Sequence, residues 1–447
     1  MSNPVMSRQE MQAIIEKVVR WSRADEVQVN LNSNVTGNTR FAANQLSTSG
    51  SVEDANIAVS SAFGPKHAVV TSNDLSDDSL HRLVSQSEAL ARLAPDDPEA
   101  MPSLGPQTYQ PVNAFFDSTA NLAPGDRARA ALTALEQTRA AGDLMAAGFI
   151  VTQANSGAIG NQAGLFAYHR NTSANYTLTV RTADGTGSGW AAADSQDWSQ
   201  LDFRGVAQRA VDKARASRNP VAIEPGRYTV ILEPQAAGDL VQLMAFSLDA
   251  RSADEGRSAF TREGGGTKIG ERIVDERVTI FSDPRDPQLL AQPFDGQGLP
   301  LGRQGWVENG VLRQLFYSRF WAQRQNQQPT GFPSGVKLAG GTATVDEMVA
   351  STERGVLVTR LWYLRQVDPR TILYTGLTRD GTFLIENGRI SRSVRNFRFN
   401  DSPLFMLNNL DTLGRAERLA GTEAGGDIVM PAIKVHDFNF TSLSEAV

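Results

Sequence analysis

Cysteine is absent from this chain of 447 residues, and histidine occurs only four times, at His67, His81, His169 and His436. The lack of cysteine excludes disulfide bonds, thiolate nucleophiles and thiolate metal ligands, and it suits a reducing cytosol. Only His436 adjoins another possible ligand, Asp437. Because neighbouring strand residues point to opposite faces, this pair is not expected to hold one metal ion, and we predict no metal site in this chain.

Lysine and long apolar runs are also scarce. The chain has six lysines, none next to another, and a formal net charge of -6, which argues against a nucleic-acid partner. No apolar run approaches the ~18 residues needed to span a bilayer, and the opening "MSNPVMSRQEMQAIIEK" lacks the apolar core of a signal peptide. We therefore expect a cytoplasmic protein that binds neither nucleic acid nor membrane.

Common catalytic motifs are missing as well. "REGGGTKIGER" has the wrong spacing for a phosphate-binding loop and no hydroxyl after Lys268, and "DGTGSG" lacks the dinucleotide-binding spacing. No G-x-S-x-G occurs. A metal-free Ser-His-Asp site around His169 or His436 stays open as an alternative. The Gly-rich stretch 252–270 has few apolar anchors, and we expect it to be mobile.

The pattern of elements predicts an α+β protein. Ser7 and Glu10 form a capping box before a first helix, and Ser76 or Asp77 can begin a second. Between them, Val27, Val29 and Leu31 alternate with polar residues as in a half-buried strand. A stretch dense in proline at 95–112 predicts a linker. We expect an N-terminal α+β domain at 1–100, a middle α+β domain at 112–225 and a β-rich domain at 226–447.

The last of these domains carries three legible turns. Asn309-Gly310, Asp380-Gly381 and Asn387-Gly388 each lie between strand-like runs. Asn-Gly and Asp-Gly favour the two-residue turns of β-hairpins. We therefore predict three hairpins in a large antiparallel sheet or open barrel.

The stretch "RYTVILEPQAAGDLVQLM", from Arg227 to Met244, predicts a strand followed by a helix. Proline is tolerated at the first helical position, and a carboxylate suits the positive end of the helix dipole. Glu233-Pro234 is thus expected to begin the helix. From their place at this junction, Glu233, Gln235 and Asp239 are our candidates for residues lining a substrate groove.

With these segments in place, the chain resembles the TldD/PmbA (TldD/TldE) family over nearly its full length. The resemblance rests on the order and spacing of several stretches, which are "TRFAANQ", "GRYTVILEPQAAGDL", "DERVTIFSDP", "FDGQGLP", "WVENGVLRQL" and "GTFLIENGRI".

The resemblance implies a heterodimeric zinc peptidase that acts on small or unfolded peptides and on precursors of modified peptides. Its catalytic subunit carries His-Glu-x-x-x-His after the same strand, and a cysteine near the C-terminus. Here Glu233 and Gly238 stand where those histidines would be and Pro234 where the glutamate would be, while Glu423 or a neighbour falls in the cysteine's region. The "LEPxAA" pattern is similar to that of the TldE/PmbA-type subunit, which lacks the motif.

We therefore expect a non-catalytic TldE/PmbA-like subunit, without catalytic or metal-binding residues of its own, that pairs with a TldD-like partner holding the zinc. A metal-independent homodimer that binds peptides or regulates another protein remains the alternative.

Overall fold

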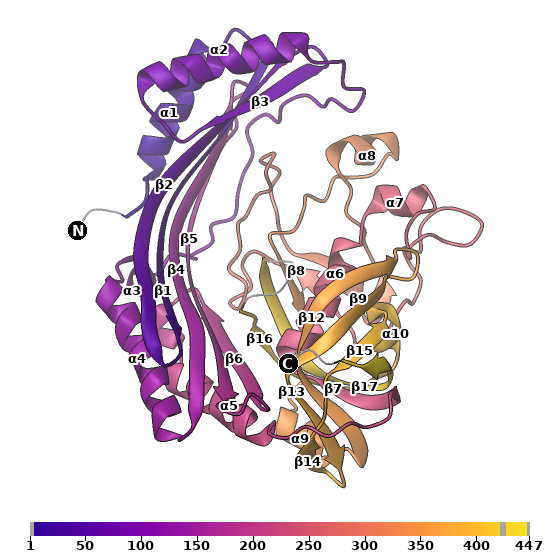
Figure 1. The fold of residues 1–447 in the computed structure, drawn as a ribbon. Helices are drawn as coiled ribbons and strands as arrows, with labels where there is room; N and C mark the ends of the chain where they lie inside the picture. Colours follow the sequence, from indigo (N-terminus) through magenta and orange to yellow (C-terminus); the bar gives the residue numbers. More distant parts are fainter. Residues whose placement is uncertain (1–3, 421–425, 445–447) are drawn as a thin grey trace.

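The computed structural model describes residues 4–420 and 426–444. It consists of two large sheets with helices packed against them (Figure 1), so the predicted α+β class is confirmed. Among the described residues, no helix combines the length and the apolar character that crossing a bilayer requires.

The first sheet has six strands, all antiparallel, in the order β3-β2-β1-β4-β5-β6. Strands β1 to β3 precede the predicted linker and β4 to β6 follow it, and the pairing of β1 with β4 joins both sets in one sheet. The division into residues 1–100 and 112–225 stays a prediction. The bounds are β1 Glu26–Ala42, β2 Gln45–Phe63, β3 Lys66–Ser72, β4 Leu144–Asn161, β5 Phe166–Thr182 and β6 Ser188–Ser195.

Helices cover one face of this sheet, which we call the outer face. At one end, Val27, Val29 and Leu31 of β1 pack against the first two helices, and the predicted Ser7–Glu10 capping box is confirmed. At the other end, Tyr176 and Leu178 of β5 pack against the next helices. The bounds are α1 Arg8–Trp21, α2 Asp77–Leu93, α3 Asp117–Ala120, α4 Pro124–Ala140, η1 Trp198–Gln200 and α5 Phe203–Ala216.

The second sheet belongs to the C-terminal part of the chain. Five of its strands close on themselves, because β7 pairs with both β12 and β17 while β12, β13, β15 and β17 follow one another. All pairings are antiparallel except β7–β12 and β11–β17. The bounds are β7 Gly226–Leu232, β8 Ile280–Ser282, β9 Gln304–Glu308, β10 Val311–Leu312, β11 Gly335–Leu338, β12 Arg354–Asp368, β13 Leu373–Glu386, β14 Arg389–Ser393, β15 Phe397–Asp401, β16 Leu410–Arg418 and β17 Asp427–Leu443.

Helix α6 is buried on almost every side within this C-terminal part. It packs on β12 and β17, and its residues from Gln235 to Gln242 are all buried. Such a helix belongs to a core rather than to a surface. The helices of this part are α6 Pro234–Phe246, α7 Ala250–Asp254, α8 Arg319–Arg324, α9 Val345–Ala350 and α10 Pro403–Asn408.

Two of the three predicted hairpins are confirmed. Asn309-Gly310 joins β9 to β10 and Asn387-Gly388 joins β13 to β14, all with positive φ. The third prediction is wrong, because Asp380-Gly381 lies inside β13 as an irregularity with φ of 54° and 125°. Asp380 is buried there, where it accepts a hydrogen bond from Ser188 and faces two arginines, so tertiary contacts override the turn preference.

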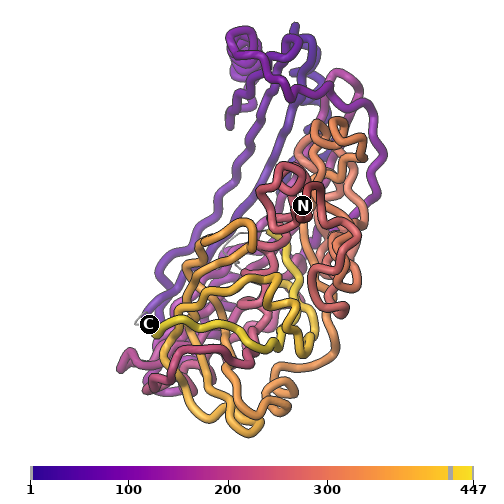
Figure 2. The backbone as a smooth tube through the Cα atoms, turned by 90° about the vertical axis from the view of Figure 1, so that its right-hand side faces the viewer, coloured from indigo at the N-terminus to yellow at the C-terminus, as the bar shows by residue number. Residues whose placement is uncertain are grey.

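The long strands of the first sheet run beside the C-terminal part along most of the molecule (Figure 2). Contacts near both ends of the sheet hold the two parts together. Near one end, Asn30 Nδ2 donates to Gly296 O at 3.1 Å, and near the other Arg418 binds Asp194 of β6. The face of the sheet opposite the helices, which we call the inner face, therefore looks toward the C-terminal part.

Candidate functional site

The junction of β7 and α6 has the predicted form. Val230, Ile231 and Leu232 are fully buried and pair with β12 on one side and β17 on the other. Glu233 is the N-cap residue and Pro234 is the first helical residue. The Glu233 N–H donates to Val358 O at 3.0 Å, which fixes the turn onto β12.

The Glu233 side chain does not cap its own helix. Its Oε2 lies 2.5 Å from Nζ of Lys213 on α5, and both side chains are 17% exposed. Lys213 also donates to Trp190 O of β6 at 3.3 Å. The carboxylate at the junction is therefore neutralised by a lysine from the first sheet's helix layer.

Gly238 lies one turn further along α6, beneath a buried leucine. A Cβ atom built on Gly238 would lie 2.0 Å from Cδ1 of Leu419 and 3.3 Å from Cγ of Met430. Real Cβ atoms do not approach other atoms this closely, so any side chain here would displace Leu419. The position is filled by packing.

The three predicted groove residues lie on the first turns of α6 but differ in access. Glu233 and Gln235 line a cavity of about 50 Å³, whereas Asp239 is not among its lining residues. Gln235 and Asp239 are buried, at 7% and 4% exposure. The structure thus brings Glu233 and Gln235 together at a small cavity, and a role in holding substrate stays a prediction.

β16 supplies two charged residues beside this cavity. Partial burial of the Glu417 carboxyl raises its pKa, and the nearby positive charge of Arg209 lowers it by less. The residue as a whole remains exposed. Arg418 donates to Asp194 at 2.7 Å and to Asp427 at 2.5 Å. Burial lowers the pKa of Arg418, but these two carboxylates raise it by more. Arg418 thus joins β6, β16 and β17 beside the junction.

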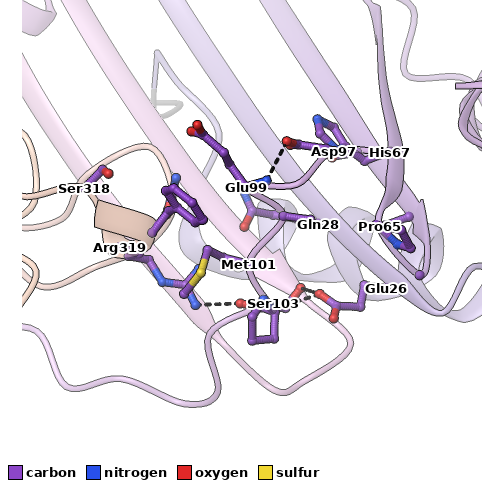
Figure 3. A pocket seen from close by; sticks show the side chains of 17 residues that line it. Glu26, Gln28, Pro65, His67, Asp97, Glu99, Met101, Ser103, Ser318 and Arg319 are labelled. Atoms are coloured by element: carbon purple, nitrogen blue, oxygen red, sulfur yellow. Dashed lines mark hydrogen bonds and ion pairs between the residues drawn. The ribbon is translucent and has the colours of Figure 1, made fainter. Parts of the chain in front are cut away.

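A larger cavity, of about 680 Å³, shares no lining residue with the junction (Figure 3). The sequence did not predict it. It is bounded by β1, the end of β2, the linker and the start of α8. Its main charged groups already have partners in the chain. Glu26 accepts from Ser103 N and Oγ at 2.6 Å, and Arg319 donates to Pro102 O at 2.6 Å. These contacts fasten the linker, and no sequence motif pointed to them.

The two histidines of the metal-free alternative do not share a site. His169 is buried on β5, burial lowers its pKa to about 4, and its Nε2 has no hydrogen-bond partner among the described residues. His436 lies on β17 and is exposed, with Nε2 at 3.0 Å from Asp411. The hydroxyl beside His436 is that of Thr229, with Oγ1 at 3.1 Å from Nδ1, and within the described chain no serine is hydrogen-bonded to either histidine.

Two parts of the chain match models of known protein families. Residues 123–218 match the PmbA/TldA metallopeptidase central domain, and residues 225–442 match the PmbA/TldA metallopeptidase C-terminal domain. The chain belongs to the PmbA/TldD family. The second match contains the whole junction, so β7, α6 and β16 are parts of a family domain.

Curated relatives and a solved structure agree with this assignment. A metalloprotease of Methanothermobacter thermautotrophicus is 27% identical over 257 residues, covering 54% of this chain and 53% of that protein. Metalloprotease PmbA of Escherichia coli O157:H7 is 24% identical over 173 residues, covering 37% of each. The matched stretches thus span about half or less of these relatives.

The fold has a close structural counterpart in the crystal structure of TldE from Thermococcus kodakarensis. The two agree with a TM-score of 0.87 over 96% of this chain and 99% of that chain, at 16% identity. At this identity the likeness establishes the fold alone.

The zinc ion that the resemblance implies for the family does not fit the junction of this chain. No histidine lies there, Glu233 is bound to Lys213, and Leu419 fills the space above Gly238. Across residues 4–420 and 426–444, no three side chains of His, Cys, Asp or Glu converge as metal ligands would. Glu423, the residue in the region of the expected cysteine, lies outside the described residues.

Proposed function

We propose that this chain is a non-catalytic subunit of the TldE/PmbA kind in a heterodimeric zinc peptidase that degrades or processes small or unfolded peptides. In this proposal a TldD-like partner subunit holds the zinc and performs the cleavage. This chain supplies interface and substrate-binding surface.

The observation that carries the proposal is the packing of the junction. A family metallopeptidase domain is retained, yet a lysine neutralises Glu233 at 2.5 Å and a leucine fills the space over Gly238. A catalytic zinc needs three protein ligands and an open position for water. A junction packed shut in this way suits a supporting subunit better than an enzyme acting alone.

The test is to purify this chain alone, the partner alone and the two together from the source cells. The partner is recognised by mass spectrometry as a co-eluting chain with His-Glu-x-x-x-His. Zinc is measured by mass spectrometry and cleavage with unfolded peptides. We expect zinc and cleavage in the pair and neither in this chain by itself.

Either of two results would contradict the proposal. Stoichiometric zinc or peptidase activity in the isolated chain would make it an enzyme in its own right. Elution only with itself, with no second chain, would favour a homodimer that binds peptides without cleaving them.

A further inference from the structure

The inner face of the six-stranded sheet is rich in asparagine. Asn30 of β1 marks this face, because its amide reaches Gly296 of the C-terminal part. Residues at even spacing from Asn30 share the face, whereas Val29 and Leu31 face the helices. The pairing registers place eight further asparagines on the inner face. Asn161 and Asn175 donate to Leu104 O and to Asp194, and the other six are Asn32, Asn34, Asn38, Asn56, Asn155 and Asn171.

Several of these side chains stand in register across the sheet. Asn34 is opposite Asp54 of β2 and Asn155 of β4, and Asn155 is opposite Asn171 of β5. One row therefore crosses four strands, with about 4.8 Å between neighbours. Asn32 and Asn56 form the start of the next row.

Asparagine is an unusual choice for these positions. It is depleted in strands, where β-branched and aromatic residues are preferred. The six carboxamides make no hydrogen bond to another part of the described chain, and all six are partly or fully exposed. Residues that break a local rule without compensation inside the fold are expected at functional sites.

We propose that this asparagine row, Asn34, Asn155 and Asn171 with its neighbours, binds the backbone of an extended, unfolded polypeptide. Each carboxamide offers both a donor and an acceptor, as each peptide group does. An extended chain lying parallel to β1 repeats about every 6.8 Å, which matches the spacing of Asn32 and Asn34 along that strand, and it would cross the row at Asn34. The proposal rests on the peptide substrate of the proposed function and places its binding surface away from the junction.

Charge and position favour a peptide over other polymers. Asp54 is the single charged residue in the row, so the row itself offers no cation to a phosphate backbone. The C-terminal part touches the inner face on both sides of the row, through Gly296 near one end and Arg418–Asp194 near the other. A bound peptide would lie between these contacts, and recognition through backbone groups would accept many sequences.

The test measures binding of a short, uncharged, fluorescein-labelled peptide to the full chain by fluorescence anisotropy. The same peptide with methylated backbone nitrogens probes backbone recognition. The triple variant Asn34→Val, Asn155→Val, Asn171→Val removes the row, and Asn73→Val, in the exposed turn after β3, is the matched control. We expect the triple variant and the methylated peptide each to weaken binding by roughly tenfold or more, while Asn73→Val changes nothing.

Thermal unfolding separates a binding role from a structural one. Valine favours strands, so the triple variant is expected to unfold at the same temperature as the wild type or higher while binding is lost. Equal binding by the methylated peptide, unchanged binding by the triple variant, or no binding by the wild type would overturn the proposal. So would binding of an oligosaccharide such as maltohexaose in place of the peptide, or a triple variant that keeps the peptide and loses the partner chain.

A failure of this peptide-binding proposal can be told apart from a failure of the proposed function. Peptide binding is read on the isolated chain, whereas the proposed function is read from zinc, cleavage and co-elution of the partner. If the chain pairs with a zinc subunit but its asparagine row does not bind the peptide, only the peptide-binding proposal is contradicted.

Discussion

The junction and the inner face differ in how the chain treats its polar groups. At the junction, Glu233 is paired with Lys213 and the space above Gly238 is filled by Leu419. On the inner face, the carboxamides of Asn34 and Asn155 are partly exposed and have no hydrogen-bond partner in the described chain. The difference teaches that a junction inside a metallopeptidase family domain is packed as a core, while the surface that we propose for peptide binding carries no sequence motif.

The largest effect is expected from removing the contact that links the junction to the inner face. Arg418 lines the junction cavity and binds Asp194, which lies on the inner side of β6. Both side chains are 11% exposed, so Arg418→Met leaves a buried carboxylate without its partner. We expect this change to lower the free energy of unfolding by about 3–5 kcal/mol, measured by denaturant titration.

The matched control for this change is Arg398→Met on β15, where the arginine is exposed and makes one long hydrogen bond to Thr375. Surface substitutions of this kind usually alter stability by less than about 0.5 kcal/mol. Equal effects of the two variants would mean that the Arg418 contacts do not hold the two regions together.

Lowering the pH should destabilise the folded protein because His169 is buried on the inner face. The unfolded chain binds a proton at this residue near pH 6.5, whereas burial lowers the pKa in the folded protein to about 4. Between these values only the unfolded chain is protonated, so the free energy of unfolding falls as the pH drops, by up to about 3 kcal/mol. His169→Gln should flatten this part of the stability–pH profile relative to the wild type, and an unchanged slope would show that His169 does not cause it.

Adding a single methyl group to the packed junction should also be unfavourable. Gly238→Ala would normally stabilise a helix by about 1 kcal/mol, but here the new Cβ meets Leu419 at 2.0 Å. We expect a net loss of about 1–2 kcal/mol from overpacking. The double variant Gly238→Ala, Leu419→Ala should be less destabilised than the two single effects predict, and strict additivity would show that the two residues do not compete for space.

Local patterns in the sequence account for the parts of the fold that depend on neighbouring residues. The Ser7–Glu10 capping box and the Asn387-Gly388 hairpin were predicted because their partners lie within a few positions. Asp380-Gly381 was predicted wrongly, since Ser188, which holds Asp380 inside the fold, is 192 positions away.

The candidate site was predictable only in part for the same reason. Glu233-Pro234 announced a helix start, which the structure confirms, but Lys213 and Leu419 come from other elements. The asparagine row needs the register between β1 and β4, whose paired residues Asn34 and Asn155 are far apart in the sequence. Single asparagines in strands gave no signal until that register aligned them.

The smallest expected effect concerns Lys213, and it tests whether the ion pair alone closes the junction. Lys213→Met removes the ammonium from Glu233, and because water can reach both partly exposed side chains the loss should be only about 1 kcal/mol. The variant should also gain no zinc, because Glu233 and Glu417 are the only carboxylates among the cavity's described lining residues and Leu419 still fills the space over Gly238. Equilibrium dialysis against zinc measures this directly. If Lys213→Met bound one zinc ion per chain, the junction would be a metal site held shut by a single lysine, and its contrast with the inner face would disappear.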